Sequence, residues 1–261
     1  MTRAGAGNRL LHWTADGQDP REDLAFEEAV LEKAAEGQPV LFTYRWSGPA
    51  LVLGYSQRPS TVNVEACREL GVPVYRRCTG GTGVLHGDSL SLSLALPAFH
   101  PWAAGIEPLY DGFVAAGAEA LAGMGCRVER GRGRAKPYHE RSPICFEDQL
   151  FESLLVKGRK VLGCAQARRK KSVLVHGALV FRSDPSLLAR LFDISAERAV
   201  NAVGETGPLD AHATAERFAG SLASALGLEA GAAGFRPASP ARYLTRYRQE
   251  HWSPAGTEMV D

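Results

Sequence analysis

The chain has 261 residues, of which 45% are hydrophobic and 23% charged, and its formal net charge is +1 at pH 7. This length suffices for a large core without disulfides or metal ions, and we take residues 1–261 as one domain. The balanced charge argues against a general attraction to nucleic acid or to a membrane, so a charged binding face must be local.

The five cysteines contain no C-x-x-C pair, so their spacing predicts neither a zinc site nor a disulfide framework. The first 17 residues have no apolar segment of signal-peptide length, and the apolar run near residues 90–96 is too short to span a bilayer. We therefore expect a cytoplasmic protein with reduced thiols, no metal and no membrane partner.

The first third of the chain predicts alternating helices and strands. Residues 21–36 have the pattern of an amphipathic helix, and residues 40–46 and 51–55 that of two strands joined by a hairpin or short loop. A short helix is expected at residues 62–70, followed by a strand at residues 72–77.

A glycine-rich loop follows at residues 76–87, with the sequence RRCTGGTGVLHG, and leads into an alternating strand at residues 89–97. Its glycines allow a sharp bend and a close approach to a ligand. A plain turn between two strands is the alternative, and the loop lacks the Gly-Lys-Ser/Thr ending of a phosphate-binding loop.

The rest of the chain predicts more strands than helices. The expected elements are a helix at 109–124, a basic loop at 127–141, a hairpin at 153–162, a strand at 172–181, a helix at 214–226, a linker at 229–239 and a helix at 240–251. Without a regular βαβ alternation, this order predicts an α+β fold with mixed, largely antiparallel sheets flanked by helices.

Four segments together resemble the biotin/lipoate protein ligase catalytic domain family, which includes lipoate-protein ligase A and the octanoyl and lipoyl transferases. They are residues 24–29, 76–86, 158–168 and 174–179. The combination of R-R-x-T-G-G with G-R-K-x-x-G-x-A-Q is specific, whereas either motif alone is weak. The resemblance covers most of the chain, from about residue 24 to about residue 181.

The resemblance implies a narrow tunnel for a medium-length acyl chain, walled by the glycine loop and by the strand that contains Gly163, Cys164 and Ala165. The substrate-binding residues that it implies are Arg77, Thr79, Gly80, Gly81, Gly83, His86, Gly163, Ala165, His176 and Gly177. Each histidine is suited either to moving a proton or to a structural hydrogen bond.

Two residues are the catalytic candidates. The resemblance implies that Lys160 reaches the acyl carbonyl, where a cation stabilises developing negative charge, although a hairpin lysine is often only exposed. Within the family, the chain most resembles the cysteine-dependent octanoyltransferases, and this resemblance implies that Cys145 is the nucleophilic thiol. The alternative is that Cys145 is a small buried hydrophobic residue. Because a cation favours the thiolate, we expect Lys160 to activate Cys145.

Some features leave this assignment open. Residues 148–152 are Asp-Gln-Leu-Phe-Glu, where the resembling octanoyltransferases have a proline, a serine and an aromatic residue. Cys78 adjoins the glycine loop and Cys164 lies in the second motif, and we interpret both as wall residues. The basic stretch at residues 129–136 is either a solvated loop or a segment that steers an acidic partner toward the protein.

The leading hypothesis is an acyltransferase that moves an octanoyl or lipoyl group from a carrier-protein thioester to a lysine of a lipoyl-domain protein. The expected partners are acyl carrier protein and a lipoyl-domain protein such as glycine cleavage H protein or a dehydrogenase E2 subunit, with no nucleic acid. No cofactor is required. The alternatives are an ATP-dependent lipoate-protein ligase, which uses ATP and Mg²⁺ and in which Arg77 and the loop hold an acyl-adenylate, and a non-catalytic lipoyl or acyl binder.

Overall fold

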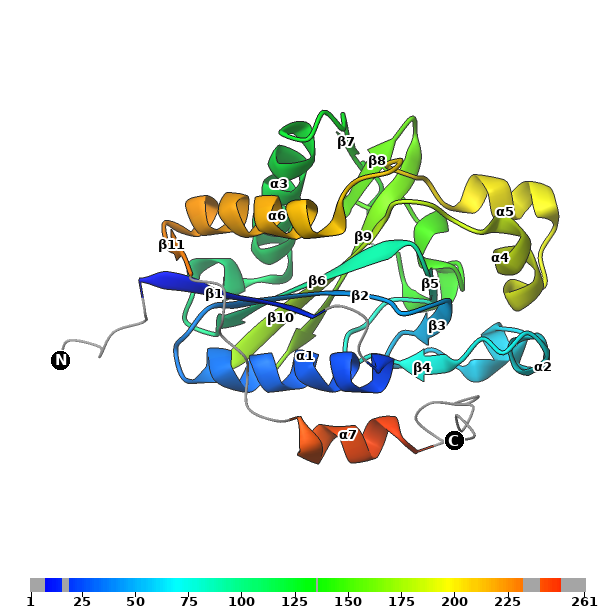
Figure 1. Cartoon of the computed structure of the whole chain (residues 1–261), viewed down its shortest axis with the longest axis horizontal. Helices are drawn as coiled ribbons and strands as arrows, with labels where there is room; N and C mark the ends of the chain where they lie inside the picture. Colours follow the sequence, from blue (N-terminus) through cyan, green and yellow to red (C-terminus); the bar gives the residue numbers. More distant parts are fainter. Residues whose placement is uncertain (1–7, 16–18, 135, 232–239, 250–261) are drawn as a thin grey trace.

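A computed structural model of the protein describes residues 8–15, 19–134, 136–231 and 240–249 (Figure 1). The described strands are β1 (Arg9–Ala15), β2 (Val40–Arg45), β3 (Ala50–Leu53), β4 (Val74–Arg76), β5 (Val84–His86), β6 (Ser89–Pro97), β7 (Glu129–Arg130), β8 (Ser153–Val156), β9 (Arg159–Arg168), β10 (Ser172–Val180) and β11 (Glu229–Ala230). They form an eight-stranded sheet in the order β11-β1-β2-β6-β10-β9-β8-β7 and a three-stranded sheet in the order β4-β3-β5.

The strand pairing is mixed and mostly antiparallel. From β2 through β6, β10, β9 and β8 to β7, every neighbouring pair is antiparallel. The parallel pairs are β1 with β2, β1 with β11, and β3 with β4. This arrangement confirms the predicted α+β fold with mixed, largely antiparallel sheets.

Helices cover both faces of the main sheet. They are α1 (Pro20–Ala35), α2 (Val64–Glu69), α3 (Ile106–Ala122), α4 (Pro185–Phe192), α5 (Ala196–Ala202), α6 (Ala211–Leu226) and α7 (Ala241–Tyr247). Figure 1 shows α3 and α6 along one face, α1 along the other, and α7 on the outer side of α1. Because α1 and α3 contact β10 from opposite sides, all nine residues of this strand are buried.

The sequence fixes the start of α1 locally. Asp19 precedes the helix and its carboxylate accepts a hydrogen bond from the backbone N–H of Arg21, while Pro20 occupies the first helical position, where its missing N–H costs nothing. Leu24 and Leu31 lie in the core, and Glu27, one turn from each of them, is also completely buried. The helix therefore carries a carboxylate into the interior.

The structure decides between two expected connections and contains elements that were not predicted. The strands expected at 40–46 and 51–55 are joined by the short loop and not by a hairpin, since β2 belongs to the main sheet and β3 to the small one. Strand β1 and helices α4 and α5 were not predicted. Their sequences are short, and their burial depends on distant partners such as β2, η4 (Cys145–Glu147) and β9.

The remaining expectations hold within about one turn. The helix expected at 109–124 is α3, and the basic loop expected at 127–141 is irregular apart from β7 and a short 3-10 turn at Tyr138–Glu140. The linker expected at 229–239 begins with β11, whose partner is β1, and its residues 232–239 lie outside the described chain. The terminal helix expected at 240–251 is α7, and residues 250 and 251 also lie outside the described chain.

The described residues contain neither a membrane-spanning helix nor a metal-binding cluster. No helix there has the length and apolar character needed to cross a membrane. Likewise, no group of three or more His, Cys, Asp or Glu side chains in this part of the chain is arranged to hold a metal ion. The five cysteines are all free thiols.

Candidate functional site

The structure brings the two catalytic candidates together. Cys145 begins η4, and Lys160 is the second residue of β9. The Lys160 Nζ atom lies 3.8 Å from the Cys145 Sγ atom. Cys145 is half-buried and Lys160 is 2% exposed, so this lysine is not the exposed hairpin residue that was the alternative.

Backbone carbonyls of the cysteine turn fix the position of the lysine. The Lys160 ammonium donates to the carbonyl oxygen of Cys145 at 3.0 Å and to that of Asp148 at 2.9 Å. A lysine ammonium has three donors, and the third is directed to the Cys145 sulfur. The arrangement holds a cation beside the thiol.

Gly163 provides the space for this pair. A Cβ atom at this position would lie 2.8 Å from Lys160 Cε and 3.4 Å from Cys145 Sγ. Any larger residue would therefore displace the lysine side chain toward the thiol or away from it. The G-R-K-x-x-G motif thus places the glycine where the lysine folds back over its own strand.

The glycine loop pairs directly with the segment that leads to Cys145. The backbone N–H of Cys145 donates to Gly83 O at 2.9 Å, and the N–H of Gly83 donates to Pro143 O at 2.9 Å. These two bonds connect segments 62 residues apart in the sequence. The loop and the thiol therefore belong to one structural unit.

Arg77 holds the glycine loop from inside. It is 2% exposed and donates to Thr79 Oγ1 and to the carbonyl oxygens of Val52, Gly80 and Thr82. Burial lowers the pKa of this guanidinium below its ordinary value. Four hydrogen bonds within the protein suit Arg77 to shaping the loop, and its predicted contact with substrate stays a prediction.

Close backbone approach explains two glycines near this loop. A Cβ atom on Gly54 would lie 1.9 Å from Gly81 O, and Gly81 itself has a φ of +83°, a conformation that L side chains rarely adopt. A Cβ atom on Gly81 would lie 3.7 Å from Ala165 Cβ, and Gly80 N donates to Gln166 O. The loop thus lies directly against β9.

A buried carboxylate lies on the same side of the sheet as the loop. Glu27 Oε1 accepts from Tyr44 Oη at 3.0 Å and from Ser93 Oγ at 2.7 Å, and it lies 2.5 Å from His176 Nδ1. Burial opposes the charge on Glu27, but the attraction of His176 and these hydrogen bonds outweigh it and lower the pKa of the carboxyl below its ordinary value of 4.5.

His86 is the second histidine of this buried group. Its ring stacks on Trp46 with 4.1 Å between centroids, and its Nδ1 atom lies 3.2 Å from Ser89 Oγ. Its ring centroid is 6.4 Å from that of His176. Burial, with smaller contributions from His176 and Arg77, places the pKa of His86 well below its ordinary value of 6.5.

Three buried atoms in this group have no hydrogen-bond partner within the described chain: Glu27 Oε2, His86 Nε2 and His176 Nε2. Buried polar atoms are normally paired, so such a group is a place where a polar atom of water or ligand fits. The predicted site included both histidines but missed Glu27 and Trp46. The feature of the sequence that would have identified Glu27 is a glutamate placed among the leucines of an amphipathic helix.

One predicted wall residue and one predicted binding residue lie on the other face of the sheet. Cys164 belongs to the hydrophobic core next to α3, and a Cβ atom on Gly177 would lie 2.9 Å from Phe113 of α3. Because side chains alternate along a strand, their neighbours Gly163, Ala165 and His176 lie on the face toward α1. The wall role of Cys164 and the binding role of Gly177 stay predictions.

The other cysteines near the motifs are poor nucleophile candidates. Cys78 is 4% exposed and Cys164 is 7% exposed, and burial raises the pKa of both thiols well above the ordinary value of 9.0. A raised pKa disfavours the thiolate that attacks acyl groups. Of the three thiols adjoining the motifs, Cys145 is the most accessible.

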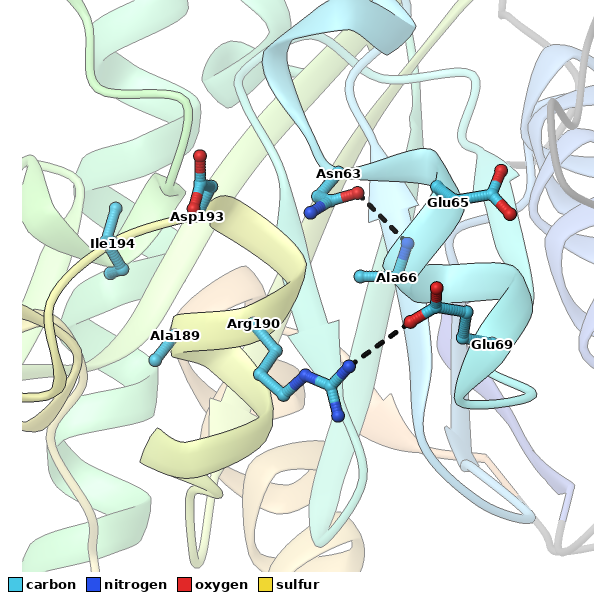
Figure 2. A pocket seen from close by; sticks show the side chains of 8 residues that line it. All are labelled: Asn63, Glu65, Ala66, Glu69, Ala189, Arg190, Asp193 and Ile194. Atoms are coloured by element: carbon cyan, nitrogen blue, oxygen red, sulfur yellow. Dashed lines mark hydrogen bonds and ion pairs between the residues drawn. The ribbon is translucent and has the colours of Figure 1, made fainter.

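A surface groove of the described chain lies elsewhere. Figure 2 shows it between α2 and α4, where Arg190 pairs with Glu69 and the Asn63 side chain accepts from the N–H of Ala66. Its charged side chains thus pair with each other or face solvent. Nothing in this groove resembles the arrangement of a thiol beside an ammonium group.

Comparison with known sequences gives consistent matches. The sequence profile described as the lipoyl protein ligase A/B catalytic domain matches residues 19–214. The octanoyltransferase LipM of Carboxydothermus hydrogenoformans is 37% identical over 174 residues, which are 65% of this chain and 64% of that protein. The LipM of Anoxybacillus flavithermus is 32% identical over 191 residues, 69% of this chain and 68% of that protein. The chain thus spans slightly under two thirds of the first relative and slightly over two thirds of the second.

Solved structures show the same fold. A crystal structure of lipoate-protein ligase A bound with ATP superposes with a TM-score of 0.79 at 19% identity, covering 96% of this chain and 99% of that one. A bipartite lipoate protein ligase from Thermoplasma acidophilum, studied with its E2 lipoyl domain, superposes with a TM-score of 0.76 at 17% identity, covering 95% of this chain and 96% of that one. At these identities the likeness concerns the fold, and it confirms the predicted catalytic-domain architecture.

Proposed function

The chain belongs to the lipoyl protein ligase A/B catalytic domain family, and from this we propose that it is an acyltransferase that attaches octanoyl or lipoyl groups to proteins through a cysteine. The names of the LipM relatives support octanoyl transfer as its activity. The observation that carries the proposal is the 3.8 Å separation of Cys145 Sγ and Lys160 Nζ.

The first step of the proposed reaction is thiol exchange. Cys145 loses its proton, and its sulfur attacks the carbonyl carbon of an octanoyl or lipoyl thioester on a carrier protein. The bond between that carbon and the carrier sulfur breaks, and the carrier leaves as a thiol after taking up a proton. One thioester replaces another, so the step needs no ATP.

Lys160 acts on the carbonyl oxygen during this exchange. Negative charge develops on that oxygen as the carbon becomes tetrahedral, and a fixed ammonium N–H stabilises it. Two of the three donors of Lys160 are bound to Cys145 O and Asp148 O, and the third is directed to the Cys145 sulfur. We place the acyl oxygen at this third donor, which turns from the sulfur to the oxygen as the sulfur forms its bond to the carbonyl carbon.

The second step forms the product. The ε-amine of a lysine on a lipoyl-domain protein attacks the acyl-Cys145 thioester, an amide bond forms, the carbon–sulfur bond breaks, and the amine proton returns to the sulfur. A thioester lies above an amide in free energy, so this step drives the transfer. The proposed acceptor is a lipoyl domain such as that of glycine cleavage H protein or an E2 subunit, since a relative in fold was studied with its E2 lipoyl domain. Acyl carrier protein is the proposed donor.

The buried group formed by Glu27, His86 and His176 lies on the face of the sheet toward α1, with the small residues Gly163 and Ala165 on the neighbouring strand. Its unpaired polar atoms suit a polar atom of the substrate rather than the apolar chain. We place the acyl chain on this face beside the glycine loop, which itself packs directly against β9.

The experiment that tests the function offers octanoylated acyl carrier protein to the purified protein without nucleotide. The expected result is a mass increase of one octanoyl group on the peptide that contains Cys145. When an apo lipoyl domain is then added, this octanoyl group should move from Cys145 to the lipoyl domain. The variants Cys145→Ala and Cys126→Ala form a matched pair, because only the first should lose the adduct. Pyrophosphate release that depends on ATP and Mg²⁺ would instead identify a ligase, and tight acyl binding with neither reaction a non-catalytic binder.

A further inference from the structure

Asp148 directly follows η4, the turn that contains Cys145, and its ionisable side chain is almost completely buried. Only 6% of the residue is exposed. One carboxylate oxygen, Oδ1, accepts from Lys136 Nζ at 2.7 Å, and the other, Oδ2, accepts from the backbone N–H of Ser142 at 3.0 Å. The side chain thus ties two points of the preceding segment to the turn.

The backbone of the same residue touches the catalytic pair. The carbonyl oxygen of Asp148 accepts from Lys160 Nζ at 2.9 Å, beside the bond from Lys160 to Cys145 O. A shift of this carbonyl therefore moves the ammonium relative to the Cys145 sulfur. The carboxylate of Asp148 restrains where its own carbonyl lies, because its two hydrogen bonds tie the residue to Lys136 and Ser142.

The adjoining Glu147 is held by a different contact. Its carboxylate accepts two hydrogen bonds from Arg198 of α5, at 2.7 and 2.8 Å, and a third from Ser142 Oγ. The two bonds from Arg198 fasten η4 to α5, whereas those of Asp148 fasten it to the segment at 136–142. Because the Arg198 bonds do not involve Asp148, removing the Asp148 contacts leaves η4 attached to α5 but free to shift.

We propose that Asp148, through its contacts with Lys136 and Ser142, is a positioning residue that holds the Lys160 ammonium at the distance from Cys145 needed for acyl transfer. The expected effect on kcat rests on the proposed function. The expected effect on the reactivity of the Cys145 thiol follows from the geometry alone and does not depend on which acyl group is transferred.

The test uses the full chain with Asp148→Asn, which keeps the shape of the side chain but removes its charge and one acceptor. Alkylation of the Cys145 peptide by iodoacetamide is followed by mass spectrometry from pH 6 to 9, and octanoyl transfer is measured in parallel. We expect alkylation at pH 7 to slow about three- to tenfold and kcat to fall about tenfold, with KM for the octanoylated carrier within about twofold, since a 1 Å misplacement costs up to about a hundredfold.

The control is Glu69→Gln, which removes a carboxylate from the exposed ion pair with Arg190 drawn in Figure 2. It should leave both the alkylation profile and kcat unchanged. A second variant, Lys136→Met, removes only the ion pair with Asp148, at a side chain that is 47% exposed. It should slow alkylation of Cys145 as Asp148→Asn does, but by a smaller factor. If Asp148→Asn does not fold, Lys136→Met decides the question.

A wild-type alkylation profile and kcat in folded Asp148→Asn would overturn the proposal. So would a lower melting temperature with an unchanged profile, because that result means a role in stability only. If the wild-type protein transfers no octanoyl group, the proposed function fails, yet the alkylation profiles still decide whether Asp148 positions the pair.

Discussion

The two halves of the candidate site are built in opposite ways. At the turn, Cys145 is half-buried, and Lys160 is held by backbone carbonyls of the same turn. In the interior, Glu27 is completely buried and is held by side chains from three strands, those of Tyr44, Ser93 and His176. Side chains at the turn can therefore change with little effect on the fold, whereas those of the interior group contribute to stability as well as to the pocket.

Glu27→Gln tests whether the interior group contributes to stability, and it should have the largest effect on stability of the variants considered. The substitution removes the charge that accepts from Tyr44, Ser93 and His176, and breaking a buried ion pair from one side costs about 3–5 kcal/mol. We expect the free energy of unfolding in urea to fall by this amount. Cys145→Ala serves as the control, and a loss below about 1 kcal/mol for Glu27→Gln would show that the buried carboxylate is not ionised.

Lys160→Met tests the turn. The variant keeps the length of the side chain but cannot donate to the acyl oxygen, and removal of one such donor reduces kcat about 10²- to 10³-fold. The rate of octanoyl transfer from acyl carrier protein measures this loss, while the urea midpoint should change less than for Glu27→Gln. A kcat within about threefold of wild type would exclude Lys160 from catalysis.

The pH dependence of stability sharpens the contrast. The pKa of His86 lies below 6.5 in the folded protein, so below about pH 6.5 the unfolded chain binds a proton at this residue and the folded chain does not. The free energy of unfolding therefore falls as the pH decreases, by at most about 1.4 kcal/mol per pH unit from this residue.

His86→Gln should make the decline between pH 6.5 and 5 shallower by up to that slope, as measured by urea unfolding at several pH values. Some acid sensitivity should remain, because burial also lowers the pKa of His12. An unchanged slope would mean that His86 is protonated in the folded protein.

The smallest effect is expected for Cys164→Ala. This thiol packs in the core beside α3, on the face of β9 opposite Lys160, so the variant should form the octanoyl adduct at the wild-type rate. The loss of one buried sulfur should cost stability only, by about 1 kcal/mol. Loss of the octanoyl adduct in this variant would show that Cys145 is not the nucleophile.

Local patterns predicted much of the fold. The helical period of residues 21–36, the alternation of residues 89–97 and the pattern of residues 172–181 correspond to α1, β6 and β10. Local patterns missed β1, α4 and α5, and they left open whether a hairpin or a short loop joins the strands that became β2 and β3. Pairing partners decide these features, and a one-dimensional pattern does not contain them.

For the site, the sequence by itself determined which chemical groups are present: a thiol, a lysine and a glycine loop in a motif combination that identifies the family. Only the tertiary structure decided which of them meet. Strand alternation placed Cys164 and Gly177 away from Cys145, and the packing of α1 brought Glu27 to His176, 149 residues further along the chain. The physical reason is that distances between side chains, and the burial that sets their pKa values, arise from packing of segments that are far apart in the sequence.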